Sequence, residues 1–230
     1  MVAVVALSLY LARYPFVMWA RSQFRRFPAG ALTFVLATSV LGVGLGLLLV
    51  LAYHLYFLLA FGAAGALLFA VHLLVVRSRK ERSVGGEFLG IVALTMAAPV
   101  SFYAVSGEVA RPAFLLWIMA ALYFGASVFY VKMRVADSLA SSSASVREAR
   151  RMRVSLVAYL ATALAATGIL SGFGPLPVFI VTAFIPMTAY TLSGVICRAK
   201  RLSIRRLGFS LLGHSAVFTL VTIVIFVLDS

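Results

Sequence analysis

Acidic residues are scarce in this sequence. The 230-residue chain has 6 Asp and Glu residues against 20 Lys and Arg residues, and charged residues make up only 11% of it. An ordinary soluble domain is about 25% charged. Because 63% of the residues are hydrophobic, so few charges would leave most of the apolar surface of a soluble protein uncovered. We therefore predict that a lipid bilayer surrounds most of the chain.

Cysteine is nearly absent as well. The single cysteine, Cys197, excludes an internal disulfide and a cysteine-rich metal site. The sequence also lacks a P-loop, a dinucleotide-binding fingerprint, a nucleophile motif and a cluster of His and Cys with metal-ligand spacing. These absences argue against a conventional soluble type of enzyme attached to a membrane.

Long apolar runs, separated by short basic clusters, dominate what is present. About 20 apolar residues cross the roughly 30 Å of hydrocarbon in a bilayer. The predicted spans are residues 1–20, two helices within 27–76 that turn at Tyr53-His54, 87–106, 113–131, two helices within 154–197 that separate at 172–177, and 207–228. The predicted fold class is all-α, a polytopic transmembrane helical bundle of about eight spans in a single membrane domain, residues 1–230.

Prolines and small residues punctuate these spans. Pro15, Pro99 and Pro186 are predicted to kink or break their helices, because proline lacks an N–H and clashes with the preceding turn. Pro112 is predicted to open a helix, where proline is favoured. Two pairs of small residues stand four apart, Gly42 with Gly46 and Gly62 with Ala66. That spacing is typical of closely packed helices in lipid.

The basic residues segregate to one side of the predicted membrane. Suppose that the loops near 21–28, 77–84, 132–153 and 198–206 lie inside and the turns near 53, 108 and 174 lie outside. Every Lys and Arg except Arg111 then falls in or beside an inside loop. By the positive-inside rule, we predict a multi-pass protein of the cell membrane with cytoplasmic basic loops, the longest at 132–153. This topology puts the first residue outside, so we expect a truncated copy of a nine-helix protein.

In this topology the net charge of +14 lies mostly beside the headgroups of the inner leaflet. We expect the lipid bilayer and its anionic headgroups as partners, and no nucleic acid. The residue pattern gives no oligomeric state.

Four short motifs suggest a family. They are Arg13-Tyr14-Pro15, the Arg-Ser-x-x-x-Arg-Ser segment from Arg77 to Ser83, the Phe-Tyr-Val-Lys-x-Arg segment from Phe129 to Arg134, and the segment from Arg206 to His214. With these motifs the chain resembles the bacterial and archaeal YwiC-like membrane proteins over nearly its whole length. The usual opening of that family, a Lys-x-His-Gly-Ala-Trp helix, is absent here, which agrees with the expected missing helix.

A more distant similarity is to the UbiA-type intramembrane prenyltransferases. It implies that residues 1–20 and 113–131 are the two helices whose ends carry Asp-rich motifs for Mg²⁺ and an isoprenyl diphosphate. Here the corresponding ends, 13–21 and 130–137, contain one carboxylate, Asp137. Mg²⁺ prefers several oxygen ligands, normally carboxylates and phosphates. The similarity therefore implies the fold, whereas Mg²⁺-dependent transfer is doubtful; we expect no cofactor, and Mg²⁺ only if a prenyl diphosphate site survives.

The candidate ligand-binding residues are polar and aromatic side chains in or near the inner halves of the predicted spans. They are Arg13, Tyr14, Trp19, Glu87, Tyr130, Lys132, Arg134, Asp137, His72 and His214. Arg13, Lys132 and Arg134 either converge on an anionic head group or act only as charges at the membrane boundary. Glu87 and Asp137 either bind a cation or substrate group, or pair with a neighbouring Arg.

The two histidines of this set have three open interpretations. His72 and His214 are paired haem ligands, part of a proton path, or bundle-facing residues with ordinary hydrogen bonds. Three functions are compatible with the whole pattern. One is a divergent, non-catalytic relative of the prenyltransferases that binds a lipid-like anion, such as an isoprenoid, in a cavity open to the cytoplasm. The others are a small transporter or permease component, and a structural or assembly factor of a membrane complex.

Overall fold

The computed structural model describes residues 1–22, 31–173, 177–197 and 203–229. All the regular elements in these ranges are helices, which confirms the predicted all-α class. The chain forms two compact units, Met1–Trp117 and Ile118–Ser230. The predicted single membrane domain stays a prediction.

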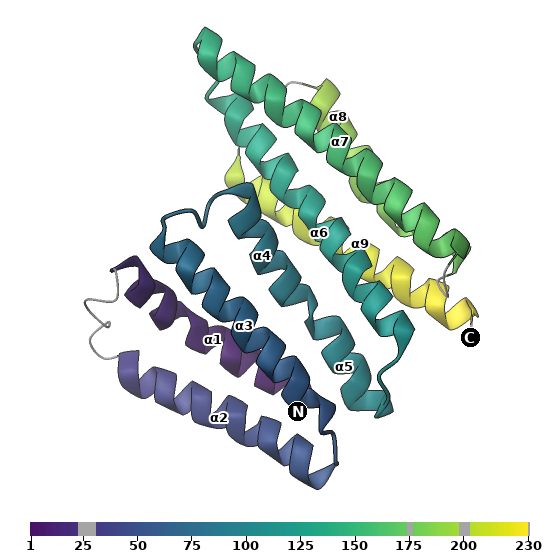
Figure 1. Ribbon diagram of the computed structural model, residues 1–230. Coiled ribbons are helices and arrows are strands. Elements are labelled where there is room, and N and C mark those ends of the chain that lie inside the picture. Colours follow the sequence, from purple (N-terminus) through teal and green to yellow (C-terminus); the bar gives the residue numbers. More distant parts are fainter. Residues whose placement is uncertain (23–30, 174–176, 198–202, 230) are drawn as a thin grey trace. The chain divides into compact units, whose positions relative to one another are not determined.

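Unit 1 contains the first five helices and the start of the sixth. They are α1 (Val2–Arg21), α2 (Ala31–Ala52), α3 (Phe57–Arg77), α4 (Val84–Thr95), α5 (Ala97–Ser106) and α6 (Arg111–Ser138). Helix α1 packs against α2 and α3, and α3 packs against α4 and α5 (Figure 1). The turn between α2 and α3 falls at residues 53–56, which confirms the helical hairpin predicted with its turn at Tyr53-His54.

Unit 2 contains the rest of α6 and four more helical elements. They are α7 (Ser143–Phe173), the 3₁₀ helix η1 (Val178–Phe184), α8 (Ile185–Ile196) and α9 (Ile204–Asp229). The 3₁₀ helix packs against α7, α8 and α9, and α8 also contacts α7 and α9.

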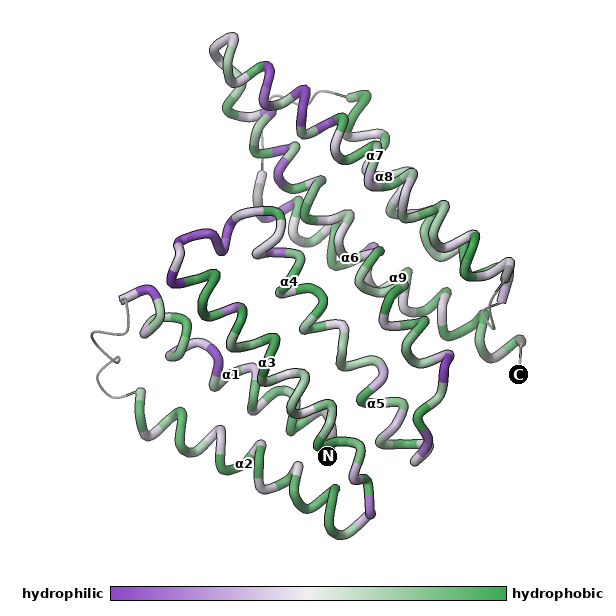
Figure 2. The backbone as a smooth tube through the Cα atoms, viewed as in Figure 1, coloured by the Kyte–Doolittle hydropathy of each residue, from purple (hydrophilic) through white to green (hydrophobic). Residues whose placement is uncertain are grey.

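Seven helical segments of the described chain are long and apolar enough to cross a membrane. They are Ala31–Ala52, Phe57–Arg77, Val84–Ser106, Arg111–Ser138, Ser143–Gly172, Phe179–Ile196 and Arg205–Phe226. Figure 2 shows hydrophobic residues along the helices and hydrophilic residues gathered mainly at helix ends and turns. The chain is therefore a polytopic membrane bundle. The remaining predicted span, residues 1–20, forms the 20-residue helix α1, and its place in the membrane stays a prediction.

The three prolines inside predicted spans have two different outcomes. Helix α1 continues through Pro15, so the break considered there does not occur. Near Pro99 the prediction is confirmed, because α4 ends at Thr95 and α5 begins at Ala97. The interruption predicted at Pro186 also occurs, because η1 ends at Phe184 and α8 begins at Ile185 with Pro186 in its first turn. Proline fits a first turn because the N–H that it lacks would have no partner there.

The basic segment 132–153 is mostly helical, which corrects its description as a long loop. Helix α6 continues to Ser138 and α7 begins at Ser143, so only residues 139–142 join them. Residues 146–153 belong to the first turns of α7. Helix α7 has 31 residues, more than the roughly 20 that a bilayer requires.

The core of unit 1 forms where α3 begins. Leu49, Leu55, Phe61 and Tyr103 are buried together. The backbone N–H of Phe57 donates to the Tyr103 hydroxyl at 3.1 Å. This bond satisfies one of the free N–H groups in the first turn of α3, a group that would be costly to leave unpaired in lipid.

Helix α1 approaches α2 most closely at a glycine. A Cβ added to Gly42 would lie 3.1 Å from the Leu9 side chain and 3.4 Å from Ser8. A Cβ added to Gly46 or Gly62 would meet nothing within 4 Å. The predicted close packing is therefore confirmed at Gly42, and the structure gives no such role to Gly46 or Gly62.

We predict that Gly42→Leu destabilises unit 1 by about 2 kcal/mol, because the added side chain overpacks the contact with α1. Gly46→Leu is the matched control, since it makes the same change on the same helix in open space. The free energy of unfolding, measured in mixed detergent micelles, should fall for Gly42→Leu alone. Equal losses for both variants would contradict this account of the α1–α2 contact.

Candidate functional site

The candidate residues divide between the two units. Unit 1 holds Arg13, Tyr14, Trp19, His72 and Glu87, and unit 2 holds Tyr130, Lys132, Arg134, Asp137 and His214. The predicted convergence of Arg13 with Lys132 and Arg134 would bring the two units together, so it stays a prediction. Within each unit the structure does bring candidate residues into contact.

In unit 1, Arg13 and His72 form a direct contact between α1 and α3. An Arg13 Nη2–H group donates to His72 Nε2 at 2.8 Å. The His72 side chain is buried, with 9% of the residue exposed. The partner of Arg13 in unit 1 is therefore a buried histidine. His72 has the third of its predicted interpretations, a bundle-facing position with a hydrogen bond.

A second polar pair joins α1 to the turn between α3 and α4. Arg21 Nη2 lies 2.9 Å from Glu81 Oε1. The Glu81 carboxylate also acts electrostatically on His72. Ser83 then starts α4, because its hydroxyl accepts the Gly86 N–H at 3.1 Å.

The other unit 1 candidates lie around these pairs. Tyr14 is 68% exposed and Trp19 is half-buried, both on α1. Glu87 lies in the first turn of α4, where a carboxylate interacts favourably with the helix N-terminus.

In unit 2, Asp137 pairs with Arg153 where α6 and α7 approach each other. Arg153 Nη2 lies 2.5 Å from Asp137 Oδ1, and the two side chains are 18% and 6% exposed. Of the two alternatives for Asp137, the structure therefore gives pairing with a neighbouring Arg. The Arg is on α7, 16 residues along the chain, so the pair fixes α6 against the start of α7.

Three aromatic rings from three helices form a row in unit 2. The Tyr130 ring contacts the Tyr190 ring edge to face at 5.2 Å between centroids. The Tyr190 ring in turn lies 4.5 Å from the His214 ring. A Cβ added to Gly194 would come within 2.6 Å of Tyr130, so this glycine makes room for the tyrosine. His214 donates from Nδ1 to the Ser210 carbonyl at 2.7 Å.

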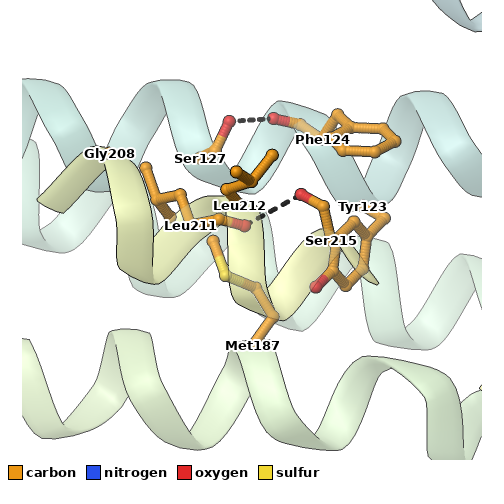
Figure 3. A pocket seen from close by; sticks show the side chains of 8 residues that line it. All are labelled: Tyr123, Phe124, Ser127, Met187, Gly208, Leu211, Leu212 and Ser215. Carbon is orange, nitrogen blue, oxygen red and sulfur yellow. Dashed lines mark hydrogen bonds between the residues drawn. The ribbon is translucent and has the colours of Figure 1, made fainter. Parts of the chain in front are cut away.

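Next to this row is a cavity of about 330 Å³. It is lined by Tyr123, Phe124 and Ser127 of α6, Met187 of α8, and Gly208, Leu211, Leu212 and Ser215 of α9 (Figure 3). Tyr123 donates its hydroxyl to the His214 carbonyl at 2.8 Å. This bond joins the cavity wall to the aromatic row.

The residues that line this cavity were not among the predicted candidates. A signal for it exists in the sequence, because Gly208 and Ser215 are small residues seven apart and share a helix face with Leu211 and Leu212. The wall formed by α8 had no such signal. Met187 is its lining residue, and nothing in the sequence indicates which neighbours it meets.

The described residues do not suit the metal that the prenyltransferase similarity implies. They contain no group of three or more His, Cys, Asp or Glu side chains that could hold a metal ion. One oxygen of Asp137, the carboxylate at the relevant end of α6, is engaged by Arg153. A two-metal diphosphate site needs several carboxylates, so no step through Mg²⁺ follows from this arrangement.

Fold and composition together define a membrane-embedded helical protein. Residues 1–102 match the family model described as YwiC-like protein. The match confirms the predicted resemblance over α1 to α4 and most of α5, including Arg13-Tyr14-Pro15 and the segment from Arg77 to Ser83. The motifs at Phe129–Arg134 and Arg206–His214 lie beyond it. No curated protein and no solved structure matches the chain.

We predict that Asp137 and Arg153 act as one unit in stability. Asp137→Ala or Arg153→Ala alone should cost about 3 kcal/mol of unfolding free energy, because each leaves the other charge buried and unpaired. The double variant should lose at least about 1 kcal/mol less than the sum of the two single losses. A double-mutant cycle measured by detergent unfolding tests this, and strictly additive losses would contradict it.

Proposed function

We propose that unit 2 binds a single-chain anionic amphiphile, such as an isoprenyl phosphate or diphosphate. Its apolar chain occupies the cavity between α6, α8 and α9, and its head group lies toward the basic ends of α6 and α9. The observation that carries this proposal is the position of an apolar cavity beside helix ends that carry arginine.

The cavity wall suits an apolar chain although it contains hydroxyl groups. Ser127 donates to the Phe124 carbonyl at 2.6 Å, and Ser215 donates to the Leu211 carbonyl at 2.9 Å. Figure 3 shows both bonds. Since Tyr123 also donates elsewhere, none of the three hydroxyls offers its proton to a ligand. A volume of about 330 Å³ is at the small end of ligand pockets and favours one chain over two.

Arginine residues lie beyond the cavity, near the C-terminal end of α6 and at the N-terminal end of α9. On α6, Arg134 is seven residues after Ser127, which puts both on one helix face. Arg134 is half-buried and acts electrostatically on Tyr130, between them on that face. On α9, Arg205 is exposed and precedes Gly208 by one turn. Arginine binds phosphate oxygens with two parallel N–H groups, so this end suits a phosphate head group.

The proposal stops at binding. The UbiA-like plan remains a proposal of its own, and the ion-paired Asp137 gives no support for Mg²⁺-dependent prenyl transfer. We also propose that the basic helix ends face the cytoplasm, as the positive-inside rule predicts. The amphiphile would then enter from the cytoplasmic leaflet.

We predict that the detergent-purified protein binds farnesyl diphosphate more tightly than farnesol or inorganic diphosphate. Farnesol supplies only the apolar chain, and inorganic diphosphate supplies only the charge. Each should therefore bind at least about tenfold more weakly than farnesyl diphosphate, a difference of about 1.4 kcal/mol in binding free energy. Chelation of Mg²⁺ should leave the affinity for farnesyl diphosphate unchanged. Isothermal titration calorimetry measures the affinity for each of the three ligands, and for farnesyl diphosphate after Mg²⁺ is chelated.

Two glycines of α9 provide a matched pair of variants. Gly208 lines the cavity and Gly213 does not, and a Cβ added to either meets nothing within 4 Å. Gly208→Leu should weaken binding of farnesyl diphosphate at least about tenfold, whereas Gly213→Leu should not change it. Arg134→Gln and Arg205→Gln should weaken binding of the diphosphate and leave farnesol unaffected. Equal affinities for both glycine variants would sink the cavity as the binding site.

A further inference from the structure

Unit 1 holds a partly buried polar network that the lipid-binding proposal does not use. It consists of Arg13 and Arg21 of α1, His72 of α3, and Glu81 in the turn that follows α3. Arg13 and His72 lie inside long apolar helices, with His72 five residues before the end of α3. Ionisable side chains at such positions are costly and mark functional sites.

The hydrogen bond to Arg13 fixes the state of the imidazole. A guanidinium group has donors only, so His72 Nε2 must accept with its lone pair and the ring must be neutral. The remaining proton is then on Nδ1. That Nδ1 is buried and has no hydrogen-bond partner among the described residues. His72 is therefore a neutral histidine with a positive charge on one side and an unsatisfied donor on the other.

Glu81 is the complementary half of the network. Its Oε1 is engaged by Arg21 at 2.9 Å, whereas its Oε2 is buried without a hydrogen-bond partner among the described residues. The same carboxylate interacts electrostatically with His72. One buried oxygen of Glu81 is thus free to receive a hydrogen bond from a cationic neighbour.

We propose that Arg13, His72 and Glu81 form a proton-binding site in unit 1, at which His72 exchanges Arg13 for Glu81. A proton from water adds to His72 Nε2, the atom that accepts from Arg13 in the neutral state. The Arg13–His72 hydrogen bond then breaks, because Nε2 has no lone pair left and two cations face each other. The imidazolium gains attraction to the Glu81 carboxylate, which stays ionised.

The surroundings of His72 leave few other groups to share this role. Helix α2 has no titratable residue, and α5 has only Tyr103, which packs against Phe57 and Phe61 at the opposite end of α3. Helix α4 contributes Glu87 alone, in its first turn. Arg77 ends α3, and Arg79, Lys80 and Arg82 are exposed in the turn beside Glu81. The charge on His72 is therefore set by its burial first, and then by Arg13 on one side and Glu81 on the other.

The exchange gives unit 1 two arrangements of the same charges. In the neutral state α1 is tied to α3 through Arg13 and His72. In the protonated state that tie is lost, and the turn after α3 is drawn toward His72 instead. A membrane protein with such a site responds to the pH of the compartment that reaches it. Proton-coupled movement of a solute is the class of activity that uses such a response.

Nitrogen-15 NMR of histidine-labelled protein in lipid vesicles tests the site directly. The ring nitrogens report both the tautomer and the charge of each histidine, and the chain has three, His54, His72 and His214. His72→Gln assigns the His72 signal. At pH 8 we expect His72 neutral with its proton on Nδ1, and on acidification toward pH 5 we expect a cationic signal to replace it.

Two charge-removing variants separate the proposal from a purely structural histidine. Arg13→Gln removes a repelling charge and should raise the cationic fraction of His72 at a given pH. Glu81→Gln removes an attracting charge and should lower it. Each change should shift the midpoint by about one pH unit, in opposite directions, while the His54 and His214 signals stay in place as internal controls of folding.

Two results would overturn the proposal. One is a His72 signal that stays neutral from pH 8 to pH 5 in the folded protein. The other is a midpoint that neither variant moves. The readout involves no lipid ligand, so its failure would leave the amphiphile-binding proposal for unit 2 untouched, and the reverse also holds.

Discussion

A polar group that faces hydrocarbon must find its partner within the protein, and this constraint shapes both units. The hydroxyls of Thr and Ser residues along the helices donate back to carbonyls three or four residues earlier; examples are Thr38, Thr95, Ser171, Thr191 and Ser215. Trp117 donates its ring N–H to the Val92 carbonyl at 3.0 Å. Leaving such a group unpaired in lipid costs several kcal/mol, so these polar atoms are satisfied within the helices or by a neighbouring helix.

The need to pair polar groups in hydrocarbon also explains the polar atoms around the cavity and around His72. In unit 2 the hydroxyls of Ser127 and Ser215 donate to backbone carbonyls. The cavity is therefore chemically apolar although these two residues line it. Charge that a ligand could use is then confined to the helix ends. Buried polar atoms without a hydrogen-bond partner among the described residues occur at His72 and Glu81 in unit 1, and also at Asp137, Arg153, Thr167, Thr188 and Thr222 in unit 2. Each such atom requires an explanation, and for His72 and Glu81 the proposed proton-binding site supplies one.

Charge and hydropathy predicted the fold well because the bilayer imposes them on the sequence directly. The hairpin turn near Tyr53 and the interruption near Pro99 followed from uncharged length and from proline chemistry. The extent of the segment 132–153 did not, because a polar helix end beyond the bilayer looks like a loop by composition.

The contacts of the candidate sites were less predictable. His72 lies 59 residues from Arg13, and Tyr123 lies 91 residues from His214. Which residues meet across such distances depends on how each helix is rotated about its axis. A uniformly apolar helix such as α2 gives no periodic signal for that rotation. Polar residues could be selected as candidates, whereas their partners Glu81, Arg153 and Tyr190 required the packed structure.

The central claim is that the cavity of unit 2 holds the chain of an anionic amphiphile. Photo-crosslinking with an isoprenyl phosphate that carries a diazirine on its chain, followed by mass spectrometry of the peptides, tests it most directly. The account predicts labelling at Met187, Leu211 and Leu212, which excess unlabelled isoprenyl phosphate suppresses. Labelling spread without competition over exposed residues of α2, such as Val40 and Leu51, would show contact with the bilayer-facing surface only and would contradict it.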